Sequence, residues 1–187
     1  MITVFATQIY RAAIAVDEGL AKVCLVTARD DGAGQRWAKK HDYRGYTSYA
    51  SLDDLPARYP EIAELKTGID AHVKRFARQL RFARTKLELD SLWINVMEPG
   101  GVHGAHIHPH SAISGTYYVA LPRGSSAIRF EDPRLPLMMA APLRREKPFL
   151  TLIPKPGTLL LWESWLRHDV PQTKGRGRRI SISFNYS

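Results

Sequence analysis

Three histidines carry the residue types and the spacing of a metal site. His106 and His108 form a His-x-His pair, and His168 follows much later in the chain. In a β-type segment the side chains of residues i and i+2 lie on the same face, so we expect the two imidazoles of the pair to point the same way. His168, from a distant strand, would complete a three-point face. Neutral imidazole suits iron, zinc, copper or nickel, so the pattern predicts a divalent metal site.

A basic cluster follows the last of these histidines. It contains Arg178 and Arg179 and runs into a segment, residues 179–186, with strict polar/apolar alternation. An arginine beside a metal can hold an anionic co-substrate through paired hydrogen bonds. In a strand, the alternation places four polar residues on one face: Arg179, Ser181, Ser183 and Asn185. We expect this polar face to line the interior of a barrel and the apolar face to pack against an N-terminal helix.

Other residues near these motifs have two readings each. His103 and His110 flank the histidine pair. The sequence leaves two roles for them, as metal ligands or as groups that support the ligands. For three tryptophans the sequence favours core packing over a place in the wall of a pocket, because large aromatic side chains are mostly buried: Trp93, Trp162 and Trp165.

The second half of the chain has the sequence pattern of an antiparallel β protein. Short runs rich in aromatic and β-branched residues alternate with Pro and Gly turns. They predict strands at residues 91–97, 115–121, 127–130, 158–162 and 179–186. A series of short strands joined in this way is typical of an antiparallel sandwich or barrel.

The first half of the chain is more helical. From Pro60 to about Leu80 apolar residues recur at helical spacing, which predicts one amphipathic helix, or two if the chain breaks near Gly68. We expect a first strand within residues 2–5 and a turn or loop at residues 32–34. The fold class predicted from both halves is mainly β with N-terminal helices.

The composition is that of a single globular domain over residues 1–187. Hydrophobic residues make up 44% and charged residues 24% of the sequence, as is ordinary for a protein with a sizeable core. We expect residues 1–86 to form a strand and helical support and residues 87–187 the β core. A single cysteine, Cys24, rules out an intrachain disulfide and a cysteine-built zinc site. Because the sequence shows no signal-peptide pattern and no long apolar run, we expect a cytoplasmic protein without a membrane span.

The net charge of +9 favours acidic partners, such as nucleic acid, anionic lipid or an anionic small molecule. A basic nucleic-acid-binding module is therefore one alternative function. The sequence has no zinc-finger spacing, no aromatic RNA-binding signature and no suitably placed Gly-x-x-Gly clamp, so nucleic acid is possible but not favoured.

An ordered set of motifs resembles the 2-oxoglutarate/Fe(II)-dependent oxygenases, and most closely a bacterial group of them. The resemblance covers about residues 87–187, with a weaker likeness at residues 6–10 and 45–48. It implies a double-stranded β-helix (jelly-roll) catalytic core packed against helices. The motifs that carry it are Trp93–Val96, Pro99–Gly101, His106–Pro109, Ser114–Val119, Phe130–Arg134, Pro156–Gly157, Trp165–His168 and Arg179–Phe184.

The resemblance also assigns the metal ligands. His106 matches the first histidine of the family's His-x-Asp/Glu pair, and His168 matches its distal histidine. His108 stands where the family has a carboxylate, which leaves three neutral ligands. Alternatively, one of two acidic residues supplies an anionic metal ligand: Glu131 or Asp132. Two further alternatives are a cupin-like three-histidine protein or dioxygenase that does not use 2-oxoglutarate, and a site that binds metal without turnover.

For the co-substrate, the resemblance implies that Arg179 pairs with the C5 carboxylate of 2-oxoglutarate, with Arg178 as the alternative. Ser181 completes an Arg-x-Ser pattern, Tyr118 matches a tyrosine that can hydrogen-bond the same carboxylate, and Asn95 is a weaker candidate for the site lining.

The activity implied by the resemblance is oxidation of an unknown substrate with Fe(II), 2-oxoglutarate and O2, and with release of succinate and CO2. We expect a small-molecule or peptide substrate, with an anionic one favoured by the charge of the chain. The segment between Pro133 and Phe149 is a candidate substrate lid, because it is long, apolar at first and then basic. The sequence does not determine the oligomeric state, and a homodimer is one alternative.

Overall fold

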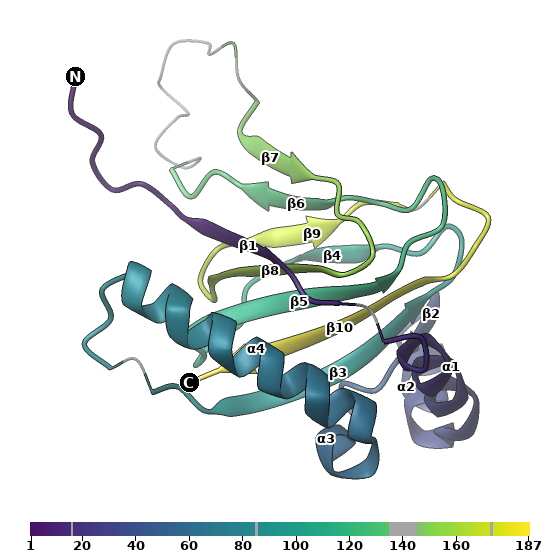
Figure 1. The fold of residues 1–187 in the computed structure, drawn as a ribbon. Helices are drawn as coiled ribbons and strands as arrows, with labels where there is room; N and C mark the ends of the chain where they lie inside the picture. The colour runs from purple at the N-terminus through teal and green to yellow at the C-terminus, as the bar shows by residue number, and fades with distance from the viewer. Residues whose placement is uncertain (16, 85, 135–144, 146, 173) are drawn as a thin grey trace.

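Two antiparallel sheets face one another in the computed structural model, which describes all residues except 16, 85, 135–144, 146 and 173 (Figure 1). The candidate lid lies mostly outside the described residues. The larger sheet has six strands in the order β1 (Ile9–Ala13), β8 (Thr158–Glu163), β5 (Ile113–Ala120), β10 (Arg179–Tyr186), β3 (Leu89–Met97) and β2 (Gly45–Thr47). The smaller sheet has four, in the order β4 (His103–His106), β9 (His168–Val170), β6 (Ile128–Glu131) and β7 (Phe149–Leu152). This is the predicted architecture, mainly β with helices near the N-terminus.

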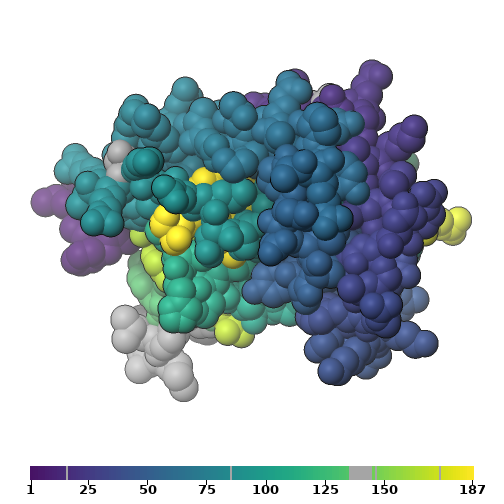
Figure 2. All heavy atoms as spheres, turned by 90° about the horizontal axis from the view of Figure 1, so that it is seen from below, coloured from purple at the N-terminus to yellow at the C-terminus, as the bar shows by residue number. Residues whose placement is uncertain are grey.

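The helices belong to the N-terminal half and cover one face of the larger sheet (Figures 1 and 2). In Figure 2 the purple to teal segments form most of this side, and the yellow C-terminal end shows mainly as a small patch between them. The described residues contain the helices α1 (Leu20–Asp30), α2 (Gly32–Lys40), α3 (Leu55–Arg58) and α4 (Pro60–Gln79). None of the helices in the described part of the chain is long and apolar enough to cross a membrane.

Helix α4 supplies the main apolar layer against the sheet. Its buried side chains recur at helical spacing, and they share one core cluster with Ile182 and Phe184 of β10. Burying each such side chain contributes about 1.5–3 kcal/mol. The helix continues through Gly68, where the side chain of Ile14 packs close to the backbone. The predicted single helix is therefore confirmed, and the break near Gly68 does not occur.

The two faces of strand β10 have different surroundings, as the alternation of its residues predicts. Ile180, Ile182, Phe184 and Tyr186 face the helices and belong to the large core cluster. The opposite face lies between the two sheets, where Arg179, Ser181 and Ser183 line an internal cavity.

Two expectations for the N-terminal region are wrong. Residues 2–5 form no strand, and the side chains of Ile2 and Phe5 are exposed; the first strand is β1, which pairs with β8 at the edge of the larger sheet. Residues 32–34, predicted as a turn or loop, form the first turn of α2. The Asp31 carboxylate accepts hydrogen bonds from the backbone N–H groups of Ala33 and Gly34, and this N-cap stabilises a helix start that its glycines would otherwise disfavour.

Candidate active site

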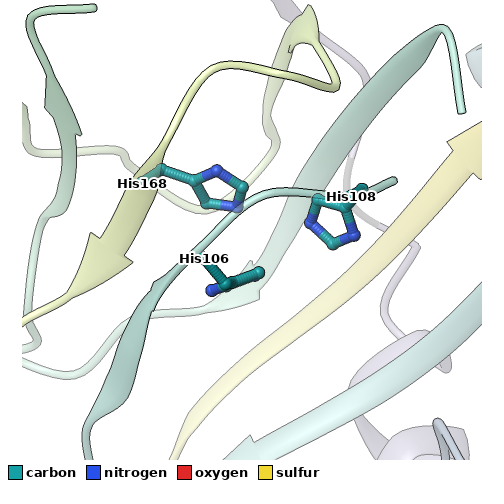
Figure 3. A group of neighbouring side chains, drawn as sticks. All are labelled: His106, His108 and His168. Atoms are coloured by element: carbon teal, nitrogen blue, oxygen red, sulfur yellow. The ribbon is translucent and has the colours of Figure 1, made fainter. Parts of the chain in front are cut away.

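The three predicted histidines come together at one end of the space between the sheets. His106 ends β4, His168 begins β9, and the two are direct partners in the antiparallel register. His108 lies two residues beyond β4, where its backbone N–H donates to the carbonyl of Ser164 at 3.0 Å. Each ring offers one nitrogen to a group whose members all lie within 4.8 Å of one another (Figure 3). This spacing suits three ligands of a single metal ion.

Backbone carbonyls fix the tautomers of two of these rings. Nδ1 of His168 lies 2.9 Å from the carbonyl oxygen of Leu166, and Nδ1 of His106 lies 2.7 Å from that of Gly104. A carbonyl oxygen only accepts, so in each ring Nδ1 carries the proton and Nε2 keeps its lone pair. A backbone partner on the second ring nitrogen is the usual support of a metal-bound histidine.

Burial keeps two of the imidazoles neutral. It lowers the pKa of His168 from 6.5 to about 3 and that of His108 to about 4, with the neighbouring imidazoles as a further cause. Only neutral imidazole binds a metal, so these rings are ready as ligands at neutral pH.

Aromatic side chains shield the triad. Trp162 packs edge-on against His168 with ring centroids 4.7 Å apart, and Trp93 lies 5.9 Å from His108. Both tryptophans are buried, as predicted, and both also line the cavity between the sheets. Trp165 differs from the prediction, because 47% of it is exposed and it belongs neither to the core nor to this cavity.

A buried arginine lies in the same cavity. Arg179 begins β10, is 3% exposed, and donates from Nη1 to the hydroxyl of Ser181 at 3.1 Å. Its guanidinium carbon lies 5.2 Å from the centre of the Tyr118 ring. Burial raises the pKa of Tyr118 to about 12, while the charge of Arg179 acts in the opposite direction. Tyr118 is therefore a neutral hydrogen-bond donor at physiological pH.

Several polar atoms around Arg179 lack a partner within the described protein. They are Nε of Arg179, the hydroxyl of Tyr118 and Oδ1 of Asn95, which donates from its amide nitrogen to Ser183 at 3.3 Å. Buried polar atoms are nearly always hydrogen-bonded and buried charges nearly always paired, so a buried arginine without a carboxylate partner among the described residues, next to the Tyr118 hydroxyl, indicates a site for an anion. No Asp or Glu stands among the described residues that line this cavity of about 40 Å³. The donors therefore suit the carboxylate of a small ligand that fits tightly.

Residues 91–185 match the protein family described as "Putative 2OG-Fe(II) oxygenase". The chain belongs to this family of 2-oxoglutarate/Fe(II) oxygenases. The resemblance noted in the sequence is thereby confirmed. No curated protein matches the sequence.

Among solved structures similar to this chain, two with TM-scores of 0.60 or more share its fold. The epimerase SnoN from nogalamycin biosynthesis is 15% identical, with a TM-score of 0.62 over 97% of this chain and 78% of SnoN. The viral collagen prolyl hydroxylase vCPH of Paramecium Bursaria Chlorella virus-1 is 11% identical, with a TM-score of 0.60 over 95% of this chain and 94% of vCPH. A 2OG-Fe(II) oxygenase family oxidoreductase from Burkholderia pseudomallei is 20% identical over 68% of this chain, which spans 55% of that protein, with a TM-score of 0.49.

Within the oxygenase site, the two candidate arginines lie in different places. The Arg178 side chain is 57% exposed, and its Nε donates to the Glu98 carboxylate at 2.8 Å. It lines a groove beside α1 rather than the cavity between the sheets. Only Arg179 lies in the cavity with the histidines.

The two candidate carboxylates are held away from the triad. Glu131 accepts from Nε of Arg167 at 3.1 Å, and Asp132 pairs with Arg134 at 2.8 Å. Neither belongs to the described group of potential ligand atoms, which contains only the three histidines.

The flanking histidines have different surroundings. His103 stacks on His106 with ring centroids 5.1 Å apart and lines the cavity, and burial lowers its pKa to about 4. His110 is exposed in the turn that follows.

Sequence reasoning assigned no role in the site to Tyr43. Its ring contacts His103 edge-on at 5.6 Å, and its hydroxyl is buried without a described partner. It precedes β2 in an irregular segment, where no periodic pattern could have indicated its position.

Proposed function

We propose that this oxygenase is a non-haem Fe(II)- and 2-oxoglutarate-dependent dioxygenase acting on a small molecule. The observation that supports the proposal best is the pairing of two features in one cavity. Three imidazole nitrogens lie within 4.8 Å of one another, and a buried arginine nearby lacks a carboxylate partner among the described residues.

In this proposal His106, His108 and His168 hold the iron. Imidazole nitrogen suits Fe(II), and a metal held by these three side chains would remain open to the co-substrate. Bound iron and 2-oxoglutarate together supply the oxidising chemistry, in which the co-substrate is converted to succinate and CO2. The carbonyls of Gly104 and Leu166 hold two of the rings in the ligating tautomer.

Arg179 anchors the co-substrate. Its guanidinium and the Tyr118 hydroxyl donate to the far carboxylate, while Ser181 holds one guanidinium nitrogen in place. The charge of Arg179 is already removed from water in the free protein, so pairing with a carboxylate compensates a cost that is present before binding. Asn95 lies on the neighbouring strand, opposite Ser181, and offers an unpaired amide oxygen to the same cavity.

The surrounding side chains restrict water at the reacting centre. Trp162 and Phe130 pack on His168, and Trp93 packs near His108. An apolar surround strengthens the ion pair at Arg179 and limits side reactions of an oxidising centre.

Ligands bound to the structural relatives support this assignment. SnoN has been solved with Fe3+, alpha ketoglutarate and nogalamycin RO, and vCPH as its 2OG complex. A cavity that combines a metal-binding triad with an anion site is consistent with the same pair of cofactors in this chain.

Co-substrate turnover without a primary substrate tests the proposal. We expect the purified protein, given Fe(II), 2-oxoglutarate and air, to produce succinate measurable by NMR, and His106→Ala to fall to the level of the protein-free control. Iron bound by the wild-type protein without any consumption of 2-oxoglutarate would instead favour the cupin-like or non-catalytic alternative.

A further inference from the structure

A second cavity opens beside the histidine triad. Its volume is about 590 Å³, within the range of sites that hold small organic molecules. It shares four residues with the inner cavity around Arg179: Trp93, His103, His106 and His108. Because the two cavities meet at the ligating histidines, a molecule in the outer one would be next to the metal. We call this outer cavity the entry cleft.

Aromatic rings form one wall of the entry cleft. They come from α2, from the segments on either side of β2, and from β3: Trp37, Tyr43, Tyr49 and Trp93. Tyr49 contacts Trp93 edge-on with centroids 5.1 Å apart, and Trp93 in turn lies 5.9 Å from His108. A surface of aromatic rings therefore leads from Tyr49, which is 59% exposed, to the metal site.

The lining of the entry cleft also contains a carboxylate. Asp90, on β3, is the only Asp, Glu, Lys or Arg among the described lining residues. The described residues place no Lys or Arg nitrogen within 4.0 Å of it, and its one hydrogen bond there is a long contact of 3.4 Å from the Ser111 hydroxyl. The cleft is thus negative or neutral although the whole chain carries a net charge of +9.

We propose that the entry cleft binds a small organic cation, an amine whose ring or apolar face lies on the aromatic wall and whose ammonium group faces Asp90. This deepens the proposed function, on which it rests, by naming the substrate class. Aromatic faces attract cations, most strongly at Trp and Tyr, and Asp90 adds a direct charge interaction. An anionic substrate, the expectation from net charge alone, would have to approach Asp90 without a cation in the described wall to compensate.

Matched probes of opposite charge test the proposal. We would measure binding of 2-phenylethylamine, 2-phenylethanol and 3-phenylpropanoate by ligand-observed NMR to the Zn(II)-loaded protein. Saturating 2-oxoglutarate keeps the Arg179 site filled, so that the carboxylate probe cannot bind there. We expect the amine to bind about tenfold more tightly than the carboxylate, since opposite-charge contacts and like-charge repulsion act in the same direction.

Two variants separate the charge from the rings. Asp90→Asn should weaken amine binding about two- to fivefold, the range of an exposed charge pair, and leave the alcohol unchanged. Tyr49→Ala should weaken all three probes. The matched control is Glu64→Gln. Glu64 is an exposed residue of α4, which covers the other face of the larger sheet, so this substitution should leave the binding of every probe unchanged.

The same samples distinguish failure of the proposed function from failure of the cation proposal. If 2-oxoglutarate does not bind the metal-loaded protein, the proposed function fails. If 2-oxoglutarate binds but the amine has no advantage over the carboxylate, or Asp90→Asn and Glu64→Gln behave alike, or no probe binds at millimolar concentration, the cation proposal alone is overturned.

Discussion

Replacement of Arg179 by methionine should change two properties in opposite directions. In the free protein Arg179 is 3% exposed, and the ion pairs of the described residues give it no carboxylate partner. It therefore imposes a desolvation cost that no carboxylate in the described cavity compensates. Arg179→Met removes that cost with a side chain of similar length, and it also removes the proposed anchor of 2-oxoglutarate.

The magnitudes follow from these contacts. Replacing buried ionic side chains by apolar ones of similar volume is often neutral or stabilises proteins by about 1–4 kcal/mol, the range we adopt for Arg179. The lost hydrogen bond to Ser181 offsets about 1 kcal/mol of this gain. For 2-oxoglutarate, losing two charge-assisted hydrogen bonds costs about 3–5 kcal/mol, which raises Kd more than about 100-fold.

Urea unfolding and calorimetry measure both effects. We expect metal-free Arg179→Met to be at least as stable as wild type. Zn(II) and 2-oxoglutarate should shift the stability difference in favour of the wild type, because ligand at about 100 times Kd stabilises the wild type by about 2.7 kcal/mol. The control is Arg178→Met, which removes the neighbouring charge from an exposed pair with Glu98 and should leave the Kd of 2-oxoglutarate within about twofold. Equal 2-oxoglutarate affinity in wild type and Arg179→Met, or a shift caused by Arg178→Met instead, would refute this reasoning.

Three other perturbations have definite expected outcomes. Burial lowers the pKa of His168 to about 3, so in acid the unfolded chain binds more protons than the folded one. The stability that this effect contributes above about pH 6.5 is therefore lost as the pH falls, by about 2 kcal/mol at about pH 5. In urea titrations with EDTA present, His168→Gln should lose about 2 kcal/mol less than the wild type over this pH range. His108→Ala should weaken Zn(II) binding at least about 100-fold by competition with a chelator, whereas Glu131→Gln should leave it unchanged if the triad alone holds the metal. Gly115→Ala should lower the free energy of unfolding by about 1–3 kcal/mol, because its Cβ would lie 2.5 Å from the ring of Phe184; an unchanged urea midpoint would contradict this packing.

The features that the sequence predicts well are those with a short period and one buried face. Strand β10 occupies residues 179–186, as predicted, because alternating Ile and Phe must face a core while alternating Ser and Asn need polar surroundings. Helix α4 follows from the same logic at helical spacing. The direction shared by His106 and His108 is likewise a local property of extended chain.

Other features depend on contacts that no local pattern contains. The helix at residues 32–40 begins at glycines and needs the Asp31 cap, which a composition-based prediction of a turn overlooks. The direct pairing of His106 with His168 depends on long-range registry between β4 and β9. Tyr43 reaches His103 from an irregular segment. Asp90 has no motif around it, and only the fold places it beside the entry cleft.

Anaerobic titration of the protein with Fe(II) and then 2-oxoglutarate tests the central claim most directly, with the visible charge-transfer band of an iron-bound 2-oxo acid as the signal. We predict that the band develops with one equivalent of 2-oxoglutarate in the wild type, disappears in His106→Ala and needs much more 2-oxoglutarate in Arg179→Met. Iron bound by the three histidines, with no band at any concentration of 2-oxoglutarate, would contradict the account.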